Sequence, residues 1–355
     1  MRIGIDYLPA TTHAPGVGRY ARELVRALVG LGSDHELRLL EFGLERRSVG
    51  DLGLEAAGRG VVRRRVPLPR RLLASRLCPG VDRLAGGVDV FHHVLPGALP
   101  VSRSLRSIFL SEVPAPGSPG AARLAAEVAG MDAVLVCSQG AAADVVAGLG
   151  LGEQRVHVVP VGCDHWSRCH KPRDAPSAPA TVLVLGAPSP SRHPRVILDA
   201  WRLLRRRGHE CELRFVGGPA RDDGVLEAAL SDEPHARHDL PHESELPAVV
   251  ADAASLVHLS DAESTAVTPL EAFSFGVPVV ASDLPAFRET LGDEARLLPN
   301  AALDAEPSVL ADAMALALEG AGEAAGRARR RGVARGYTWR RNAEATLEIW
   351  SGLVG

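Results

Sequence analysis

The sequence is poor in lysine, in cysteine and in long apolar runs, and each shortage narrows the class of protein. Lys171 is the only lysine, and the formal net charge of the 355 residues is −3, a balance that does not favour a nucleic-acid-binding protein. No stretch approaches the roughly 18 apolar residues of a membrane-spanning helix. The N-terminus, MRIGIDYLPA, turns polar too early for a signal peptide. We therefore expect a cytoplasmic protein that binds no nucleic acid.

The five cysteines form an odd and scattered set, which argues against a disulfide framework. Potential metal ligands do gather in the stretch CDHWSRCH, which contains Cys163, His165, Cys169 and His170. Five residues separate its two cysteines, whereas structural zinc sites usually place about two to four between them. We prefer to interpret this stretch as a polar segment between domains, and we expect no metal site.

Short β-branched runs alternate with helical patterns along the chain, which at 355 residues is long enough for two domains. A polar, proline-containing segment at 165–180 interrupts this alternation. Such alternation predicts parallel sheets with helices on both faces. We therefore predict an α/β protein of two doubly wound, Rossmann-like domains facing across a cleft, followed by an amphipathic helix at 337–355. Strands are expected at 2–6, 36–42, 87–94, 106–113, 132–138, 155–162, 181–187, 211–218, 255–260 and 277–282.

The segment 44–73 fits no element clearly, and its arginines gather at 63–65 and 70–71. A basic amphipathic face from Arg63 to Arg71 could contact anionic lipid, which would place the protein at the inner face of the membrane. A solvated loop or a helix on the acceptor side is the more ordinary interpretation.

Two glutamates stand eight positions apart in the stretch ESTAVTPLEAFSFGVPVV, which begins at Glu263. The residues TPLE predict a helix start with Thr268 as N-cap and Pro269 at the first helical position. Glu271 would then be a capping-box residue worth about 1 kcal/mol. The loop before this helix would lie at the carboxyl end of a strand, where ligands bind in open α/β sheets. The helix N-terminus would suit a diphosphate.

Helix capping does not account for Glu263, which follows the predicted strand 255–260 beside the same anion site. A carboxylate next to phosphates is unfavourable unless it meets hydroxyl groups or a developing positive charge. Sugar hydroxyls and an oxocarbenium-like centre would both satisfy it. The pair of glutamates therefore suggests a nucleotide-sugar site, with one carboxylate at each end of the ligand.

The Glu–x7–Glu spacing followed by AFSFGVPVVASD resembles the signature of the retaining GT-B glycosyltransferases of family four. The stretches RIGIDYLPATTHAPGVGRYARELVRAL, VHVVPVGCD, FVGGP and YTWRRNAEATLEIW are similar to other parts of the same family. The resemblance implies an N-terminal acceptor-side domain at 1–165, with the helix 337–355 packing back on it, and a donor-binding domain at 166–336. It implies that Glu271 holds the ribose hydroxyls and that Glu263 contacts the transferred sugar. It also implies that the diphosphate is held by the amides of Thr265, Ala266, Val267 and Thr268.

The sequence departs from the family pattern at three places. The usual pair of basic residues falls on Ala187 and Arg192, so one cation remains, as a guanidinium that can bind a phosphate through two N–H groups. The family's histidine and aspartate on the acceptor side fall on Ser111 and Glu112. The loop Gly-Phe-Gly-Leu-Pro is replaced by residues 264–268. We take Arg192 and Glu263 as the candidate catalytic residues.

The stretch PGVGRYA has the form G-x-G-x-x-A, and Glu41 follows at a distance that suits a dinucleotide site. An oxidoreductase that binds a nicotinamide cofactor is therefore an alternative. The fingerprint requires its glycines directly after the first strand, but nine residues separate Asp6 from Gly16. We prefer a mobile loop in which Gly16 and Gly18 close over the donor diphosphate, with simple turn glycines as the other interpretation.

These patterns predict an enzyme that moves a sugar from a nucleotide-diphosphate sugar to a small or lipid-linked acceptor, with retention of configuration. No cofactor beyond the donor is expected. The loss of the usual basic residue and histidine leaves one further alternative, a catalytically inactive homologue that serves as a partner or regulator. The base, the sugar, the acceptor and the oligomeric state stay open.

Overall fold

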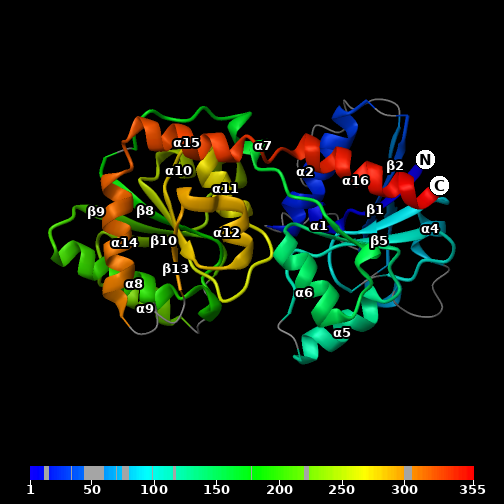
Figure 1. The fold of residues 1–355 in the computed structure, drawn as a ribbon, viewed down its shortest axis with the longest axis horizontal. Helices are drawn as coiled ribbons and strands as arrows, with labels where there is room; N and C mark the ends of the chain where they lie inside the picture. Colours follow the sequence, from blue (N-terminus) through cyan, green and yellow to red (C-terminus); the bar gives the residue numbers. More distant parts are fainter. Residues whose placement is uncertain are drawn as a thin grey trace. The chain divides into compact units, whose positions relative to one another are not determined.

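The computed structural model describes residues 1–11, 16–32, 34–43, 60–68, 70–73, 80–97, 99–114, 117–176, 178–219, 224–299 and 306–355. Its contacts divide the chain into two compact units. Unit 1 consists of Met1–Gly162 and Trp339–Gly355, and unit 2 consists of Cys163–Thr338. Each unit contains one sheet with packed helices (Figure 1).

Unit 1 is built on a parallel sheet of seven strands in the order β3-β2-β1-β4-β5-β6-β7. The strands are β1 (Arg2–Asp6), β2 (Glu36–Phe42), β3 (Val61–Val66), β4 (Val90–His93), β5 (Leu105–Phe109), β6 (Ala133–Val136) and β7 (Val156–Val158). The helices are α1 (Leu8–Thr11), α2 (Val17–Gly30), α3 (Arg70–Leu73), α4 (Val81–Leu84), α5 (Pro119–Val128), α6 (Gln139–Leu149) and α16 (Trp339–Val354).

The last helix, α16, belongs to unit 1 although its sequence follows unit 2. It lies along α2 (Figure 1). Asn342 donates to the carbonyl of Pro160 at 2.9 Å, and the indole of Trp350 donates to Ser107 on β5 at 2.9 Å. Trp339 and Trp350 are both buried, so apolar burial and hydrogen bonds together fix the helix.

A buried polar network lies where α2, β4, β5 and α16 meet. His92 Nδ1 is 2.9 Å from the Ser107 hydroxyl, and His92 Nε2 is 3.2 Å from the Tyr20 hydroxyl. The ring of Tyr20 stacks on Phe109, with centroids 3.7 Å apart. Burial lowers the pKa of His92 to about 3, so this ring is neutral at physiological pH.

Unit 2 is built on a parallel sheet of six strands in the order β10-β9-β8-β11-β12-β13. The strands are β8 (Ala180–Leu185), β9 (Cys211–Val216), β10 (Ala236–Asp239), β11 (Ser255–His258), β12 (Val279–Ser282) and β13 (Arg296–Leu298). The helices are α7 (Asp164–Ser167), α8 (Pro194–Arg206), α9 (Val225–Ser231), α10 (Leu246–Asp252), α11 (Val267–Ser274), α12 (Pro285–Leu291), α14 (Pro307–Glu319) and α15 (Ala324–Ala334).

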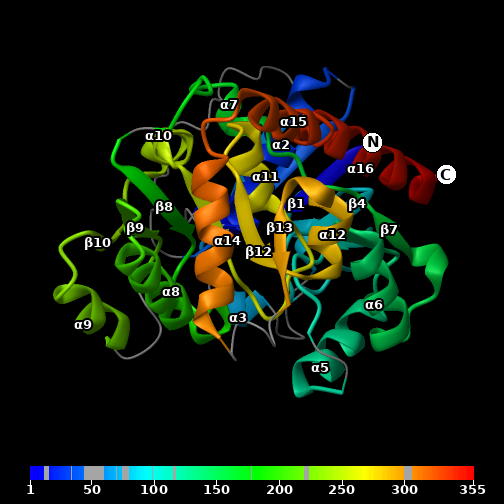
Figure 2. The ribbon, with the colours of Figure 1, turned by 60° about the vertical axis from the view of Figure 1, so that its left-hand side comes forward.

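Helices cover both faces of this second sheet. Along β8, Val182 and Val184 join an apolar cluster with α8, α9 and α14, whereas Leu183 and Leu185 join one with α10, α11 and α12. Figure 2 shows α8 and α14 together on one side of the strands. Burial on both faces of the sheet explains why residues 182–185 of β8 are all apolar.

The strand order reverses between β8 and β11. The chain runs outward from β8 through β9 to β10 and then returns to the other side of β8 as β11. The connections that leave β8 and β11 therefore turn to opposite faces, and in doubly wound sheets such a reversal leaves a crevice at the carboxyl ends of the two strands, where ligands bind. The predicted site residues Arg192 and Glu263 follow these two strands.

Three strands of the structure were not predicted from the sequence. They are β3, whose arginines are exposed, and β10 and β13, which are short and partly exposed. The segment 61–66 is a strand, not the loop or helix predicted for this arginine-rich part of the chain; residues 44–59 and 69 lie outside the described residues. Among the described helices, none is both long enough and apolar enough to cross a membrane.

Candidate active site

Arg192, His258 and Glu263 form a cluster at the switch point of the second sheet. Arg192 follows β8, His258 ends β11, and Glu263 lies in the loop after β11. The guanidinium Nη2 donates to Glu263 Oε1 at 2.7 Å, and Nη1 lies 3.3 Å from His258 Nε2. The structure thus brings together the two predicted catalytic residues. It also places His258, which lies in the predicted strand 255–260, beside them.

The surroundings of Glu263 and His258 determine whether each side chain is charged. Burial alone would raise the pKa of Glu263, but its contacts with His258 and Arg192 outweigh burial and bring that pKa below the ordinary value. Burial, with a smaller effect of the Arg192 charge, lowers the pKa of His258 despite the opposing carboxylates. At neutral pH the cluster therefore consists of a cation, an anion and a neutral imidazole, and Arg192 donates to Glu263.

Further contacts join the loop after β8 to the loop after β11. The amide of Asp261 donates to the carbonyl of Ser191 at 3.0 Å, and its carboxylate lies 2.7 Å from His193 Nε2. His193 adopts a left-handed conformation with φ of 49°, directly before Pro194 at the start of α8. This backbone conformation costs free energy in a residue other than glycine. The contact with Asp261 holds His193 in place and links the two loops.

Two glycines let the backbones at the ends of β8 and β9 approach closely. A Cβ added to Gly217 would lie 2.4 Å from the carbonyl carbon of Gly186. Gly186 has a φ of 120°, and a Cβ there would lie 3.7 Å from the Arg192 guanidinium carbon. Position 217 therefore requires glycine because a Cβ has no room there, and position 186 requires it because its φ is positive.

The helix that carries Glu271 begins earlier than predicted. α11 starts at Val267 with Ala266 as its N-cap and without a side-chain cap, so the predicted capping box of Thr268 and Glu271 is wrong. The carboxyl of Glu271 is fully buried and lies 3.1 Å from His165 Nε2 on α7. Glu271 therefore does not cap its own helix, and its carboxyl lies beside a residue from another helix.

The first turn of α11 follows directly in the sequence on the loop that contains Glu263. The first N–H groups of a helix have no acceptor within the helix, and they mark its positive end. Val267 and Thr268 contribute such amides, while Pro269 has none. Thr265 and Ala266 precede this turn, so the whole predicted diphosphate segment lies at the helix start.

The segment predicted as a polar linker is partly a structural element of unit 2. α7 starts at Asp164, and Trp166 is buried in the apolar cluster that contains α11. Cys163 is also buried, and its thiol faces the carbonyl oxygens of Ala334 and Tyr337 at 3.4 Å. Within the part of the chain that the structure describes, no group of three or more potential metal ligands is present.

The remaining predicted residues lie in unit 1. Gly16, with φ of 71°, is the N-cap of α2, whereas Gly18 is buried within the first turn of that helix and not in a loop as predicted. Helix α1 intervenes between β1 and these glycines, and Glu41 pairs with Arg63 at 2.6 Å. Neither feature suits a dinucleotide fingerprint.

The two predicted acceptor-side residues follow the end of β5. Ser111 is half-buried and Glu112 is exposed.

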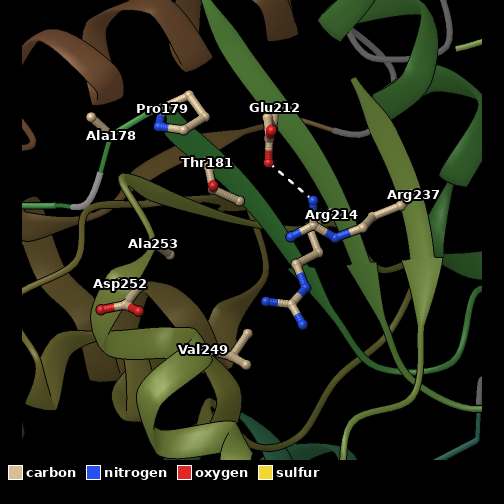
Figure 3. Close-up of a pocket in the computed structure, with 9 residues that line it drawn as sticks. All are labelled: Ala178, Pro179, Thr181, Glu212, Arg214, Arg237, Val249, Asp252 and Ala253. Atoms are coloured by element: carbon tan, nitrogen blue, oxygen red, sulfur yellow. Dashed lines mark hydrogen bonds and ion pairs between the residues drawn. The ribbon is translucent and has the colours of Figure 1, made fainter. Parts of the chain in front are cut away.

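A separate pocket of about 200 Å³ lies at the opposite, amino-terminal edge of the second sheet. Thr181, Glu212 and Arg237 stand near the starts of β8, β9 and β10 (Figure 3). Arg237 pairs with Glu212 at 3.0 Å, and Arg214 pairs with Asp239 at 3.0 Å, so its charges are largely compensated. The full lining is Ala178, Pro179, Thr181, Glu212, Arg214, Arg237, Val249, Asp252 and Ala253.

The second unit resembles known glycosyltransferases in sequence. Residues 168–333 match the family model Glycosyl transferases group 1. An MMP alpha-(1->4)-mannosyltransferase of Mycolicibacterium hassiacum is 29% identical over 185 residues, which cover 50% of this chain and 44% of the relative. The chain thus spans less than half the length of that curated relative.

Solved structures share the fold over nearly the whole chain. HepE of Anabaena, in complex with UDP and glucose, superposes with a TM-score of 0.71 at 17% identity and covers 99% of both chains. A glycosyltransferase from Rickettsia africae gives a TM-score of 0.69 at 13% identity, covering 99% of this chain and 98% of its own. These likenesses confirm the predicted fold class. The chain therefore has the GT-B fold of two parallel-sheet α/β domains, and residues 168–333 of its second unit match the glycosyltransferase group 1 model.

Proposed function

We propose that the protein is a retaining GT-B glycosyltransferase of family four, which transfers a hexose from a nucleotide-diphosphate sugar to a small or lipid-linked acceptor. The observation that carries this proposal is the Arg192–Glu263–His258 cluster at the switch point of unit 2, beside the start of α11. A cation and a helix N-terminus suit a diphosphate, and a buried carboxylate beside them suits sugar hydroxyls.

Arg192 has the geometry to stabilise the leaving group. Its guanidinium faces Glu263 and His258 and keeps further N–H groups for phosphate oxygens. The arginine charge would lie between Glu263 and the phosphates, which removes the repulsion that two neighbouring anions would otherwise feel. Together with the amides of Val267 and Thr268, it supplies positive potential without a divalent metal in the proposed reaction.

The chemical step is a substitution at the anomeric carbon. The bond from this carbon to the diphosphate oxygen breaks, and a bond to the acceptor hydroxyl oxygen forms on the same face. The hydroxyl proton passes to the departing diphosphate. Glu263, held ionised by its neighbours, would stabilise the positive charge that develops on the sugar.

A ligand panel followed by an activity assay tests the proposal. We expect nucleoside diphosphates and a nucleotide sugar to raise the melting temperature, since a ligand at about 100 times its Kd stabilises the folded state by about 2.7 kcal/mol. UDP-glucose and GDP-mannose belong in the panel because the named relatives bind UDP with glucose or act as a mannosyltransferase.

Three outcomes distinguish the alternatives. Release of nucleoside diphosphate from one donor supports the enzyme. Tight donor binding without release or transfer over a broad acceptor screen supports the inactive homologue. Stabilisation by a nicotinamide dinucleotide alone would contradict both.

We also propose that the protein contacts anionic lipid through the edge strand β3 at the inner membrane surface, which would give access to a lipid-linked acceptor. Arg64 and Arg65 are exposed there, and Val62 and Leu68 are 38% and 43% exposed. Each arginine near an anionic surface contributes about 1 kcal/mol. Sedimentation with phosphatidylserine vesicles should fall for a variant with Arg64→Glu and Arg65→Glu, and binding to phosphatidylcholine vesicles should be weak throughout; equal binding to both vesicles would contradict the proposal.

A further inference from the structure

Three consecutive residues in the loop after β8 contact the loop after β11. The carbonyl of Ser191 accepts from the amide of Asp261 at 3.0 Å. Arg192 Nη2 donates to Glu263 Oε1 at 2.7 Å, and His193 Nε2 lies 2.7 Å from Asp261 Oδ1. In the sequence, Arg192 thus stands between two residues that both contact Asp261.

The side chain of His193 makes a directional contact. An ionised carboxylate can only accept, so Nε2 carries the hydrogen and donates to Asp261. The histidine side chain is 13% exposed and the aspartate side chain is 56% exposed. A hydrogen bond to an ionised group is stronger than one between neutral groups. The contact therefore has the strength and the geometry to hold one loop against the other.

The backbone at His193 gives a reason to look for a role of its side chain. Of the residues whose backbone is described, only His193 combines a side chain with a positive φ, which is 49°. It also directly precedes Pro194, and the residue before a proline is ordinarily extended. Glycine adopts this conformation without steric cost. The backbone alone therefore favours glycine here, and an unfavourable conformation kept in a candidate site points to a function of the histidine ring.

The loop after β11 is itself anchored to the sheet. The amide of Ser260 donates to the hydroxyl of Ser282, at the end of β12, at 2.9 Å. The hydroxyl of Ser260 donates to the carbonyl of Ala262 at 3.0 Å. Both serines are buried. Asp261 therefore stands on a fixed segment, and its contact with His193 extends this order to the loop after β8.

We infer that His193 is a positioning residue for the proposed reaction: through Asp261 it fixes the loop after β8, so that the Arg192 guanidinium is in place for the donor diphosphate before the donor binds. The inference rests on the proposed function, in which Arg192 meets the leaving group. A donor of hydrogen bonds that is already in place needs no reorganisation when charge develops, so it lowers the barrier to the chemical step. Without the contact, the arginine has to be ordered during the reaction.

The first test measures release of nucleoside diphosphate from whichever of UDP-glucose and GDP-mannose wild type consumes. His193→Gly removes the contact but suits the backbone, so it should fold as wild type does. Its kcat should fall about tenfold to a hundredfold, as expected for a displaced catalytic group, and the KM for the donor should change less. Asp261→Ala should lose the same factor. His193→Gln, which keeps an N–H donor, should retain most of the rate.

Double variants separate positioning from a role in the fold alone. His193→Gly combined with Asp261→Ala should be no slower than either single variant, because both remove the same contact. In an Arg192→Ala background, His193→Gly should have no further effect, since the group that it positions is gone. His235→Gly is the matched control: it makes the same change at an exposed histidine of the same unit and should turn over as wild type does.

Hydrogen exchange gives a readout that needs no activity. The amides of Arg192 and Asp261 donate to the carbonyls of Ser189 and Ser191 at 2.9 and 3.0 Å, so peptides that contain these amides report on the two loops. Both peptides should exchange faster in His193→Gly and in Asp261→Ala than in wild type. In His193→Gln they should exchange nearly as slowly as in wild type.

Several results would overturn the inference. Equal kcat in wild type and His193→Gly would mean that the backbone places Arg192 without the histidine ring. Equal exchange in wild type, His193→Gly and Asp261→Ala would mean that the contact holds neither loop. If wild type neither binds a nucleoside diphosphate nor releases one from a nucleotide sugar, the proposed function itself fails. The exchange measurement then still decides whether His193 and Asp261 fix the loop.

Discussion

Arg192 faces an anion and a neutral imidazole, and its partly exposed guanidinium can exchange or share these partners with a ligand. The neighbouring Arg195, in the first turn of α8, is exposed. Two arginines three positions apart thus have different surroundings, and they provide a matched pair for testing which of them meets the phosphates.

Arg192→Ala should lower kcat by about 10²–10³, because the interaction strengthens as charge develops on the leaving diphosphate. Donor affinity should fall less, and Arg192→Lys should restore only part of the rate because a point charge replaces a planar fork. Steady-state kinetics of Arg195→Ala, run in parallel, should resemble wild type. A fully active Arg192→Ala enzyme would place the phosphate site elsewhere.

Protonation of Glu263 should not lower the activity between pH 8 and pH 5. Its pKa is below the ordinary glutamate value of about 4.3, so the ionised form persists as the pH falls and is lost only below that value. The profile of kcat/KM against pH checks this expectation. If kcat/KM falls above pH 5 in wild type but not in Glu263→Gln, the pKa of Glu263 is raised and not lowered, which would contradict this expectation.

At the scale of elements, the crevice depends on how closely β8 and β9 approach at their carboxyl ends. The amide of Gly186 donates to the carbonyl of Val216 at 2.8 Å, which continues the ladder one residue past the end of β8. Gly217 follows, and its missing Cβ leaves the space that Gly186 and Ala187 occupy. The loop that bears Arg192 therefore starts from a fixed position.

Gly217→Ala should destabilise the protein by about 1–3 kcal/mol, because the new Cβ would meet backbone atoms that cannot rotate away. Gly218→Ala is the neighbouring control, since its Cβ would lie 3.9 Å from that of Ala187, an ordinary contact. Thermal unfolding of both variants measures the difference. Equal melting temperatures would show that the loop can move aside at little cost.

At the scale of the whole molecule, several buried histidines make stability depend on pH in one direction. Burial lowers the pKa of His92 in unit 1 and of His258 in unit 2. The unfolded chain then binds more protons than the folded chain below the ordinary histidine pKa of about 6.5. Stability is therefore complete above that pH and decreases as the solution becomes more acidic.

The free energy of unfolding should fall between pH 6.5 and pH 3 by up to about 1.4 kcal/mol per pH unit because of His92, and His258 acts in the same direction. The window for His92 runs from its ordinary pKa of 6.5 down to about 3 in the folded protein. Urea unfolding at several pH values gives this slope, and His92→Asn should reduce it whatever the variant's absolute stability. An unchanged slope would mean that water reaches the Tyr20–His92–Ser107 network.

The sequence by itself determined the alternating strands and helices, the two parallel sheets and the position of Glu263 after a buried strand. These features follow from local apolar periods and from the rule that parallel strands end at one edge. The edge strands β3 and β10 escaped prediction because arginines in VVRRRV and the polar residues of ARHD leave no apolar run.

Only the tertiary structure decided which side chains meet. Arg192 and Glu263 become neighbours because β11 returns to lie beside β8, and nothing in either local sequence fixes that order. His258 belongs to a predicted strand and His165 to the predicted linker, and only the structure places them beside carboxylates, Glu263 at 3.5 Å and Glu271 at 3.1 Å. The N-cap of α11 is Ala266 and not the predicted Thr268, and this helix begins without a side-chain cap.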